Sequence, residues 1–340
     1  MEIVTRRGVV WCRYISAVAL CSPALESINV RDMHSMDPHL AVSHFSPMSL
    51  IRGQTDINPP TGPASPHTGS RKALLIGVKA VGIKEFEDLN APHNDIEVIR
   101  NFLKAHGWDE TNIITLADME GWPQDAMPTK RNVVKHLKEL AANATASDQL
   151  FVFIAGHGDQ VPDTDDDEAD GYDEAFVTCD GQHIIDDELF NILVKPLPTG
   201  CTLTALFDMC HSGTGLDLPY NLPGAYTGLS TSAGNTLSKH AMKLVLEPHP
   251  EKRKQSDGKV VLWAACSDEE FCQEATIKGR EVGILTHTFT SLFDSKEFKT
   301  DPSYHNLLTL IRNKLQMHGV EQQVLISSSF DLDLKSTFNL

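Results

Sequence analysis

The chain lacks the features that mark membrane-spanning, disulfide-rich and nucleic-acid-binding proteins. No apolar run approaches the ~20 residues that a helix needs to cross a bilayer. The seven cysteines are scattered and contain no Cys-x-x-Cys pair, which favours reduced thiols in the cytosol over a disulfide framework. Positive charge is also scarce, because 46 Asp and Glu outnumber 29 Lys and Arg and give a formal net charge of −17. This balance argues against nucleic acids and anionic membranes as partners.

The first 70 residues show no pattern typical of a folded domain. Arg6 and Arg7 precede a mostly apolar stretch over 8–24, which fits a poor signal peptide or a transit peptide. We favour a disordered leader, or a wrongly assigned start upstream of Met36. Residues 37–71 are rich in Pro, Ser, His and Thr, so we predict a disordered N-terminal region over 1–70. Together with the reduced cysteines, this predicts a cytoplasmic protein, with the nucleus as a second location.

From Lys72 onward, strand-like and helix-like segments alternate regularly. This alternation predicts an α/β fold in one domain over 71–340, with a mostly parallel six-stranded sheet flanked by helices on both faces. The pattern lapses over 219–258, where we expect an irregular loop. The expected strands are 73–78, 113–116, 149–154, 203–207, 260–264 and an edge strand at 323–326. The expected helices are 94–105, 129–142 with Thr129 as its cap, 186–193, 285–293 and 304–316.

Two of the predicted strands are followed by short loops that carry reactive side chains. His157 comes directly after strand 149–154, and Cys210 follows strand 203–207. In parallel sheets, ligands bind beyond the carboxyl ends of the strands. A thiolate beside an imidazole is a strong nucleophile at neutral pH, so the pair predicts a catalytic dyad. Taken singly, such a cysteine is more often a buried small residue and such a histidine more often structural, and His211 is a competing imidazole.

Around these loops the chain resembles the metacaspases, most closely the fungal type I branch of these caspase-like cysteine proteases. The resemblance implies a caspase-like sandwich fold and a calcium-activated cysteine endopeptidase that cleaves after Arg or Lys and processes its own zymogen. In caspases the histidine lies roughly 50 residues before the cysteine, and the spacing of 53 fits. The matching segments extend from Lys72 to the C-terminus and comprise 156–158, 170–174, 185–188, 208–214, 216–220, 261–266 and 325–329.

The resemblance assigns a role to each residue of the dyad. It makes Cys210 the nucleophile, while His157 raises the reactive thiolate fraction and then protonates the leaving amine. The backbone N–H groups of Gly158 and Cys210 form the oxyanion hole in the family. Each such donor is typically worth ~3 kcal/mol in the transition state.

The resemblance also implies a pocket for the side chain that precedes the cut bond. Asp95 and Asp208 match the family's pocket acids, and a pair of carboxylates favours Arg or Lys there. Ala155 is a third pocket position, where the family usually has serine. The chain departs from the family again at Pro92, which replaces a cysteine, and at Met209, which replaces a serine. The alternative for Asp95 is an ordinary acid at a helix start, favoured by the helix dipole.

Four aspartates match the positions at which family members bind an activating calcium ion: Asp170, Asp186, Asp187 and Asp217. Calcium prefers hard carboxylate oxygens of this kind. The alternative is a solvated acidic loop in which Asp186 or Asp187 caps a helix. We reject an EF-hand in the acidic run after His157, because Glu168 stands where that loop needs a glycine.

We expect protein or peptide substrates with Arg or Lys before the cut bond, no nucleic acid, no membrane, and a monomer. Self-cleavage is expected between Lys239 and Lys254, where basic residues cluster. Two other functions stay open. A catalytically weak caspase-fold scaffold is favoured by the pocket departures and opposed by the intact dyad. A different cysteine hydrolase that acts on small molecules leaves the paired acids without a role.

Overall fold

A computed structural model of the protein describes residues 69–164, 171–221, 247–248, 254–267, 272–320 and 322–340. The predicted disordered region over 1–70 and the irregular loop over 219–258 lie mostly outside these residues. No helix within them is long and apolar enough to cross a membrane. The first element is β1 (Arg71–Gly77).

The centre of the fold is a sheet with the strand order β2-β1-β3-β7-β10-β13-β8-β9. The first five strands are parallel, and the four after the edge strand β2 are largely buried on both faces, which explains their almost unbroken apolar runs. β13 runs antiparallel between β10 and β8, so the prediction of an edge strand is wrong: two short strands from the irregular loop pair beyond it. Beyond β1, the strands are β2 (Ile113–Ala117), β3 (Gln149–Ala155), β7 (Thr202–Asp208), β8 (Tyr220–Asn221), β9 (Glu247–Pro248), β10 (Lys259–Ala264) and β13 (Leu325–Ser328).

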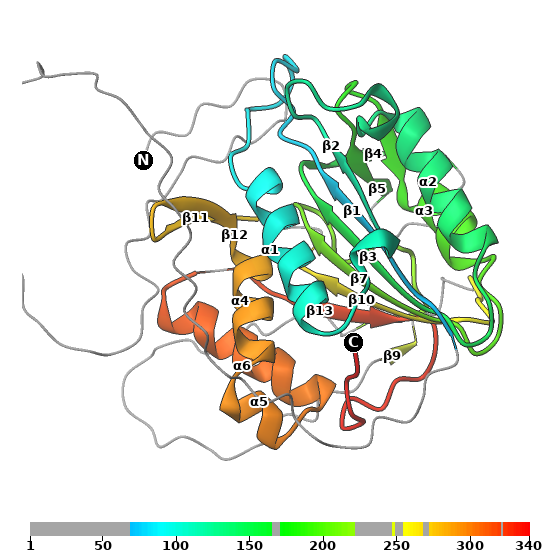
Figure 1. The fold of residues 1–340 in the computed structure, drawn as a ribbon, viewed down its shortest axis with the longest axis vertical. Helices are drawn as coiled ribbons and strands as arrows, with labels where there is room; N and C mark the ends of the chain where they lie inside the picture. Colours follow the sequence, from blue (N-terminus) through cyan, green and yellow to red (C-terminus); the bar gives the residue numbers. More distant parts are fainter. Residues whose placement is uncertain (1–68, 165–170, 222–246, 249–253, 268–271, 321) are drawn as a thin grey trace, which may run out of the picture. The chain divides into compact units, whose positions relative to one another are not determined.

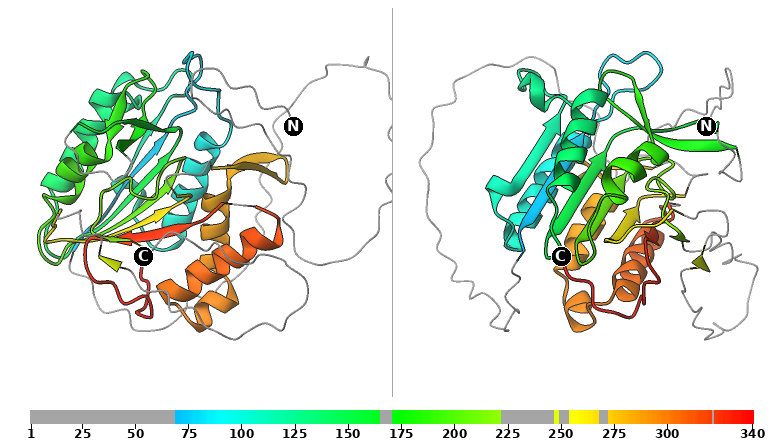
Figure 2. Two further views of the ribbon diagram at one scale, coloured as in Figure 1. Left: turned by 180° about the vertical axis from the view of Figure 1, so that it is seen from behind. Right: turned by 90° about the vertical axis from the view of Figure 1, so that its right-hand side faces the viewer.

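Helices cover both faces of this sheet, as predicted (Figures 1 and 2). Successive residues of β1 serve opposite layers, since Leu75 packs with α1, α4 and α6 and Leu74 packs with α2, α3 and η3. The helices of the first layer are α1 (Pro92–Ala105), α4 (Ile284–Phe293), α5 (Lys296–Thr300) and α6 (Tyr304–Met317). Those of the second layer are α2 (Lys130–Ala142), α3 (Asp186–Leu189) and the π-helix η3 (Phe190–Val194). Two short 3-10 helices are η1 (Glu110–Asn112) and η2 (Gln124–Ala126).

Local sequence signals account for the starts of two of these helices. The Thr129 hydroxyl caps α2 by accepting a hydrogen bond from the backbone N–H of Asn132, as expected. Pro92 stands at the first turn of α1, where the missing backbone donor costs nothing. The single helix predicted over 186–193 is instead one α-helical turn followed by the π-helix, so its position was predicted and its form was not.

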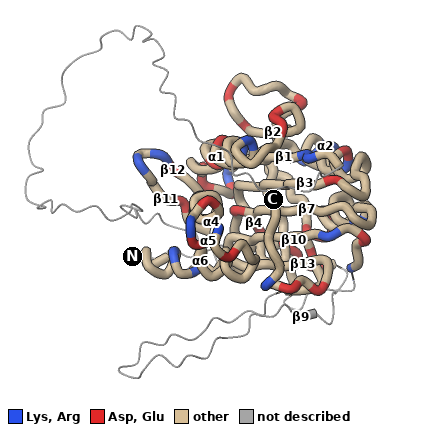
Figure 3. The backbone as a smooth tube through the Cα atoms, turned by 60° about the horizontal axis from the view of Figure 1, so that its bottom comes forward, with Lys and Arg blue, Asp and Glu red and all other residues tan. Residues whose placement is uncertain are grey.

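Two smaller sheets were not predicted, and both follow strands of the main sheet. The first has the order β4-β5-β6, and its β4 begins directly after His157. The second is the hairpin of β11 and β12, whose turn residues Lys278 and Gly279 both have positive φ, as the tightest hairpin turns require. Figure 3 shows Lys and Arg gathered on this hairpin. The strands are β4 (Gly158–Pro162), β5 (Tyr172–Val177), β6 (His183–Ile185), β11 (Glu274–Ile277) and β12 (Arg280–Gly283).

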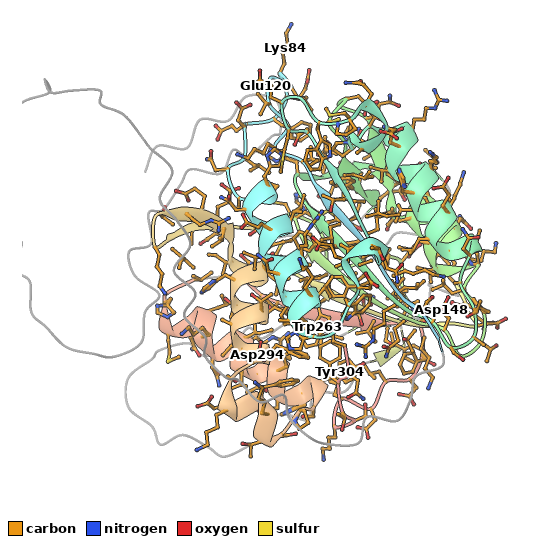
Figure 4. All side chains as sticks on the ribbon, in the orientation of Figure 1. Lys84, Glu120, Asp148, Trp263, Asp294 and Tyr304 are labelled. Carbon is orange, nitrogen blue, oxygen red and sulfur yellow. The ribbon has the colours of Figure 1, made fainter. Side chains whose placement is uncertain are left out.

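The carboxyl ends of the parallel strands meet at one edge of the main sheet. Figure 4 shows Lys84 and Glu120, in the loops after β1 and β2, at this edge. Asp148, which precedes β3, lies at the opposite edge in the same view. His157 and Cys210 follow β3 and β7, so both belong to the first edge.

Candidate active site

Strand register brings the histidine and cysteine loops together. β3 and β7 are direct neighbours, and Ala155 pairs with Asp208 at their ends. His157 and Cys210 each follow two residues later. A Cβ atom built on Gly158 would lie 1.8 Å from the carbonyl oxygen of Cys210, so the two backbones touch and only glycine fits there.

His157 is held in one orientation by the loop that follows β1. Its Nε2 lies 2.7 Å from the carbonyl oxygen of Glu87, and its ring centroid lies 5.0 Å from that of Phe86. Because a carbonyl oxygen only accepts hydrogen bonds, Nε2 carries the proton and the neutral ring keeps its lone pair on Nδ1. Burial lowers the pKa of His157, which favours this neutral form. The ring is therefore prepared to accept a proton.

Cys210 is half-buried and receives hydrogen bonds at its sulfur. The backbone N–H of Cys272 donates to Cys210 Sγ over 3.2 Å. A hydrogen bond from the Cys272 side chain lowers the pKa of the Cys210 thiol, against the opposite effect of burial. His211, the next residue, has a φ of +51°, a left-handed conformation that a non-glycine residue adopts only under constraint. Among the described residues, no hydrogen bond joins the side chains of His157 and Cys210.

Two buried carboxylates converge beside the cysteine loop. Asp95 comes from the first turn of α1 and Asp208 from the end of β7. A Cβ atom built on Gly283 would lie 2.2 Å from Oδ2 of Asp208 and 2.9 Å from Oδ2 of Asp95, so both carboxylates face the same point at the end of β12. The Gly283 N–H donates to Asp95 over 3.0 Å, and the N–H and hydroxyl of Thr286 donate to Asp208 over 2.9 and 2.7 Å.

These surroundings disfavour the charged form of both acids. Burial, followed by the charge of Asp208, raises the pKa of Asp95 well above its usual range. Burial also raises the pKa of Asp208, despite the hydrogen bonds from Thr286. Among the described residues, no lysine or arginine forms an ion pair with either carboxylate. A cationic side chain placed here would restore the charged forms.

A third acid at this place was missed by the sequence analysis. Glu274, the first residue of β11, accepts hydrogen bonds from the backbone N–H groups of Asn90 and Ala91, just before α1. Burial raises its pKa, and its charge contributes to the raised pKa of Asp95. Its position depends on the β11–β12 hairpin folding over the start of α1, and no local sequence pattern predicts that contact.

The three departures from the family pattern lie in different surroundings. Ala155 is buried at the end of β3, and Pro92 is buried in the first turn of α1, near Asp95. Met209 is 1% exposed and packs into the core between the sheet and the α2 layer. A methionine at this position therefore fills the core rather than the pocket.

The expected calcium ligands are only partly described. Asp170 lies outside the described residues, while Asp186 and Asp217 are buried and Asp187 is half-buried. The Lys254 ammonium contacts the carboxylates of Asp187 and Asp217. Within the described ranges, no group of three or more His, Cys, Asp or Glu side chains is arranged to hold a metal ion. A cation of the chain itself thus stands between two of the expected ligands.

The rejection of an EF-hand agrees with the observed hairpin. β4 pairs antiparallel with β5, and Gln160 faces Glu174 in that pairing. The Glu174 carboxylate accepts hydrogen bonds from Gln160 and from the hydroxyl of Thr214, in the loop after Cys210. Glu174, at the end of this acidic run, therefore joins the β4–β5 sheet to the cysteine loop.

Comparisons with known proteins bear on most of the chain. The family model described as metacaspase, peptidase C14 domain, matches residues 71–219. Metacaspase-1 of Emericella nidulans is 34% identical over 298 residues, covering 78% of this chain and 72% of the relative. Metacaspase-1 of Cryptococcus neoformans is 32% identical over 333 residues, covering 88% of this chain and 71% of the relative. A crystal structure of a Geobacter sulfurreducens protein aligns with a TM-score of 0.52 and 20% identity, covering 79% of this chain and 97% of that one, which shows likeness of fold alone.

The matched family region contains both site loops and both convergent aspartates. The relatives are matched over more than two thirds of their length, and the α/β fold is the one that the resemblance implied. The resemblance is therefore confirmed, and the chain belongs to the metacaspase family of cysteine-type peptidases.

Proposed function

We propose that this metacaspase is an endopeptidase that cuts after Arg or Lys, with Cys210 as nucleophile and His157 as its base. The observation that carries the proposal is the convergence of Asp95 and Asp208 on Gly283, beside the cysteine loop. Asp208 precedes Cys210 by two residues, so a basic side chain held by the carboxylates would bring the next peptide bond to the thiol. Protein substrates follow from the peptidase family.

The proposed reaction uses the tautomer of His157 that its contact with the Glu87 carbonyl favours. Nδ1 of His157 takes the proton of the Cys210 thiol, and the thiolate attacks the carbonyl carbon of the peptide bond. The C–N bond breaks as the imidazolium returns the proton to the leaving amine. Water then hydrolyses the thioester with His157 again acting as base. The contact between Nε2 and the Glu87 carbonyl supports this assignment, because it leaves Nδ1 as the accepting atom.

The proposed oxyanion hole consists of the backbone N–H groups of Gly158 and Cys210. The contact between the backbones of these residues supports it, since both amides then belong to one small region beside the thiol. Donors of this kind stabilise the negative oxygen of the tetrahedral intermediate, each by ~3 kcal/mol. A side chain at Gly158 would force the two loops apart.

The acidic pocket is the proposed source of specificity. Burial raises the pKa of both carboxylates, and the charge of Asp208 raises that of Asp95 further. Negative charge is therefore unfavourable in the empty pocket and forms a favourable ion pair when a guanidinium or ammonium enters. An acidic side chain would add a further like charge and be rejected. This preference is opposite to the cleavage after Asp that is typical of caspases.

Calcium activation is proposed on the chemistry of the acidic residues. Asp186, Asp187 and Asp217 offer the hard oxygen ligands that calcium requires, together with Asp170. The contact of the Lys254 ammonium with Asp187 and Asp217 supports this fit, because it shows that these carboxylates accept a shared cation. A bound calcium ion would supply positive charge that holds the segment after Cys210 and the start of α3 together.

The test is a peptidase assay on the purified full-length chain with millimolar calcium. We expect hydrolysis of a peptide amide that ends in Arg, no hydrolysis of one that ends in Asp, and neither reaction by Cys210→Ala. Incubation with calcium should also produce two fragments, split between Lys239 and Lys254.

Two results would reject the proposal in favour of another function. Wild type and Cys210→Ala that are equally inert on every basic peptide would favour the scaffold. Activity on a small ester or amide, without cleavage of any basic peptide, would favour a small-molecule hydrolase. Gel filtration tests the proposed monomer, and fluorescence microscopy of the tagged chain tests the proposed cytoplasmic location.

A further inference from the structure

Three cysteines from separate segments meet at the proposed nucleophile. Cys210 follows β7, Cys266 follows β10 and Cys272 precedes β11. The backbone N–H of Cys272 lies 3.2 Å from Cys210 Sγ, and Cys272 Sγ lies 3.1 Å from Cys266 Sγ. The Cys266 thiol also lies 3.5 Å from the carbonyl oxygen of Met209, the neighbour of Cys210. Cys272 therefore stands between the nucleophile and a buried third thiol.

The thiols of Cys210 and Cys272 differ in acidity, and this difference sets the order in which they are oxidised. A hydrogen bond from the Cys272 side chain lowers the pKa of Cys210, whereas burial raises the pKa of Cys272 well above its usual range. The thiolate is the form that attacks a peroxide, so Cys210 is the first of the two to be oxidised. Cys272 then presents a protonated thiol beside the oxidised sulfur.

We propose that Cys272 is the resolving thiol for oxidised Cys210, so that a hydroperoxide converts the active site into a reversible Cys210–Cys272 disulfide. This inference rests on the proposed role of Cys210 as a reactive nucleophile. It requires only the hydroperoxide as oxidant and a dithiol as reductant. None of the contacts that carry it involves the substrate pocket.

The two steps balance as follows. The Cys210 thiolate attacks one oxygen of the hydroperoxide; the S–O bond forms, the O–O bond breaks, and the alkoxide or hydroxide that leaves takes up a proton. Cys272 then attacks the sulfenic sulfur of Cys210; the S–S bond forms, the S–O bond breaks, and the departing hydroxide leaves as water with the Cys272 proton. A dithiol reverses the change by exchange and becomes a disulfide itself.

The disulfide would switch the enzyme off and protect it at the same time. With its sulfur bonded to Cys272, Cys210 is no longer a nucleophile. It is also removed from further oxidation to sulfinic and sulfonic acids, which a dithiol does not reverse. The bond would tie the start of the β11–β12 hairpin to the cysteine loop.

The experiment exposes the full-length protein to hydrogen peroxide, blocks the remaining thiols with iodoacetamide and maps the peptides by mass spectrometry. We expect peptides joined through Cys210 and Cys272, and return of the Cys210 thiol on adding dithiothreitol. Cys272→Ser keeps an N–H and a hydroxyl donor at Cys210 but cannot form the bond. Sulfinic and sulfonic acids should then accumulate at Cys210, and recovery with dithiothreitol should fall by about tenfold.

Cys179→Ser is the matched control. Cys179 is also half-buried, lies in the loop after β5, and has a pKa that burial raises to about 12. This variant should recover like the wild type. Equal recovery by Cys272→Ser, or a disulfide between Cys266 and Cys272 with Cys210 unmodified, would overturn the inference.

The mass readout separates this inference from the proposed peptidase activity. If the protein forms the Cys210–Cys272 bond but cleaves no basic peptide, the resolving role of Cys272 is supported and the proposed specificity is rejected. If it cleaves basic peptides but forms no such bond, the peptidase function is supported and the resolving role of Cys272 is rejected.

Discussion

Two buried aspartates at opposite ends of the same sheet have opposite surroundings. Asp148, just before β3, accepts hydrogen bonds from the Lys72 ammonium, from the backbone and hydroxyl of Ser70, and from the backbone N–H of Thr145. Burial alone would raise the pKa of Asp148, but these donors, led by Lys72, hold it well below its usual range. Asp208, at the end of β7, has a raised pKa.

The difference separates a carboxylate that stabilises the fold from carboxylates that need a partner from outside. At the amino ends of the strands, the chain supplies its own cation, Lys72, to a buried acid. At the carboxyl ends, Asp95 and Asp208 are buried together without such an ion pair among the described residues. Buried like charges of this kind are typical of functional sites rather than of stabilising ones.

The largest expected effect comes from removing one charge of the convergent pair. Asp95→Asn should lower kcat/KM for substrates with Arg before the cut bond by about 10²–10³, because a buried ion pair that loses one partner costs 2–5 kcal/mol. The melting temperature should not fall, since the substitution also relieves the repulsion by Asp208. Steady-state kinetics and thermal unfolding measure the two effects.

Glu97→Gln is the control for this change. Glu97 lies two residues further along α1, is exposed and pairs with Arg280. It should leave kcat/KM nearly unchanged. If Asp95→Asn lost stability and kept its activity on Arg substrates, Asp95 would belong with Asp148 as a structural acid.

The second effect concerns the opposite end of the sheet. Asp148→Asn should lower the free energy of unfolding by about 2 kcal/mol, because an amide nitrogen would face the Lys72 ammonium or a backbone donor. The activity per folded molecule should not change. Urea unfolding with a parallel peptidase assay tests both statements. A loss of specificity for Arg without loss of stability would contradict the comparison.

The main strands, the placement of His157 and Cys210, and one helix cap could be predicted from the sequence. The apolar runs of β3 and β7 predicted strands, and their parallel pairing then brings His157 and Cys210 to one edge. Local signals also fixed the cap of α2 at Thr129. Such features depend on short-range chemistry, namely apolar periodicity, side-chain caps and the direction of parallel strands.

The rest depends on contacts between distant segments. Glu274 and Cys272 reach the site only because the β11–β12 hairpin folds over the start of α1. The contact of Lys254 with Asp217 joins residues 37 positions apart, and no local sequence pattern around either residue predicts it. Met209 stands beside Cys210 in the sequence, yet its side chain packs into the core. Successive side chains at the end of a strand point to opposite sides, so a shift of one residue decides whether a side chain lies in the core or at the site. Composition does not decide this.

The third prediction concerns Lys254 and asks whether, unlike that of Lys72, its ammonium competes with a calcium ion. Both lysines neutralise buried aspartates, but Lys254 contacts carboxylates that we propose as calcium ligands. Lys254→Gln should therefore bind calcium about tenfold more tightly, equivalent to about 1.4 kcal/mol, because the competing ammonium is gone. Isothermal titration calorimetry without substrate measures this directly. Lys254→Arg, which keeps the charge, should bind like the wild type, and equal affinity of all three proteins would remove Lys254 from the site.

The smallest expected effect is a difference in the pH dependence of stability between the two ends. Asp95 and Asp208 have raised pKa values in the folded state, so the folded protein binds more protons than the unfolded chain above the unfolded pKa of about 3.9. Their contribution to the free energy of unfolding therefore increases as the pH falls from neutrality through their folded pKa values. Asp148 has a lowered pKa, so its contribution is present above about 3.9 and is lost only as the pH falls below it. The two ends thus act in separate pH windows with opposite signs.

Asp208→Asn should flatten the stability curve above about pH 4 and leave it unchanged below, whereas Asp148→Asn should do the reverse. Urea unfolding of both variants across pH 3 to 8 distinguishes them, and curves that change in the same window would mean that the two ends of the sheet do not differ in the way that their surroundings indicate.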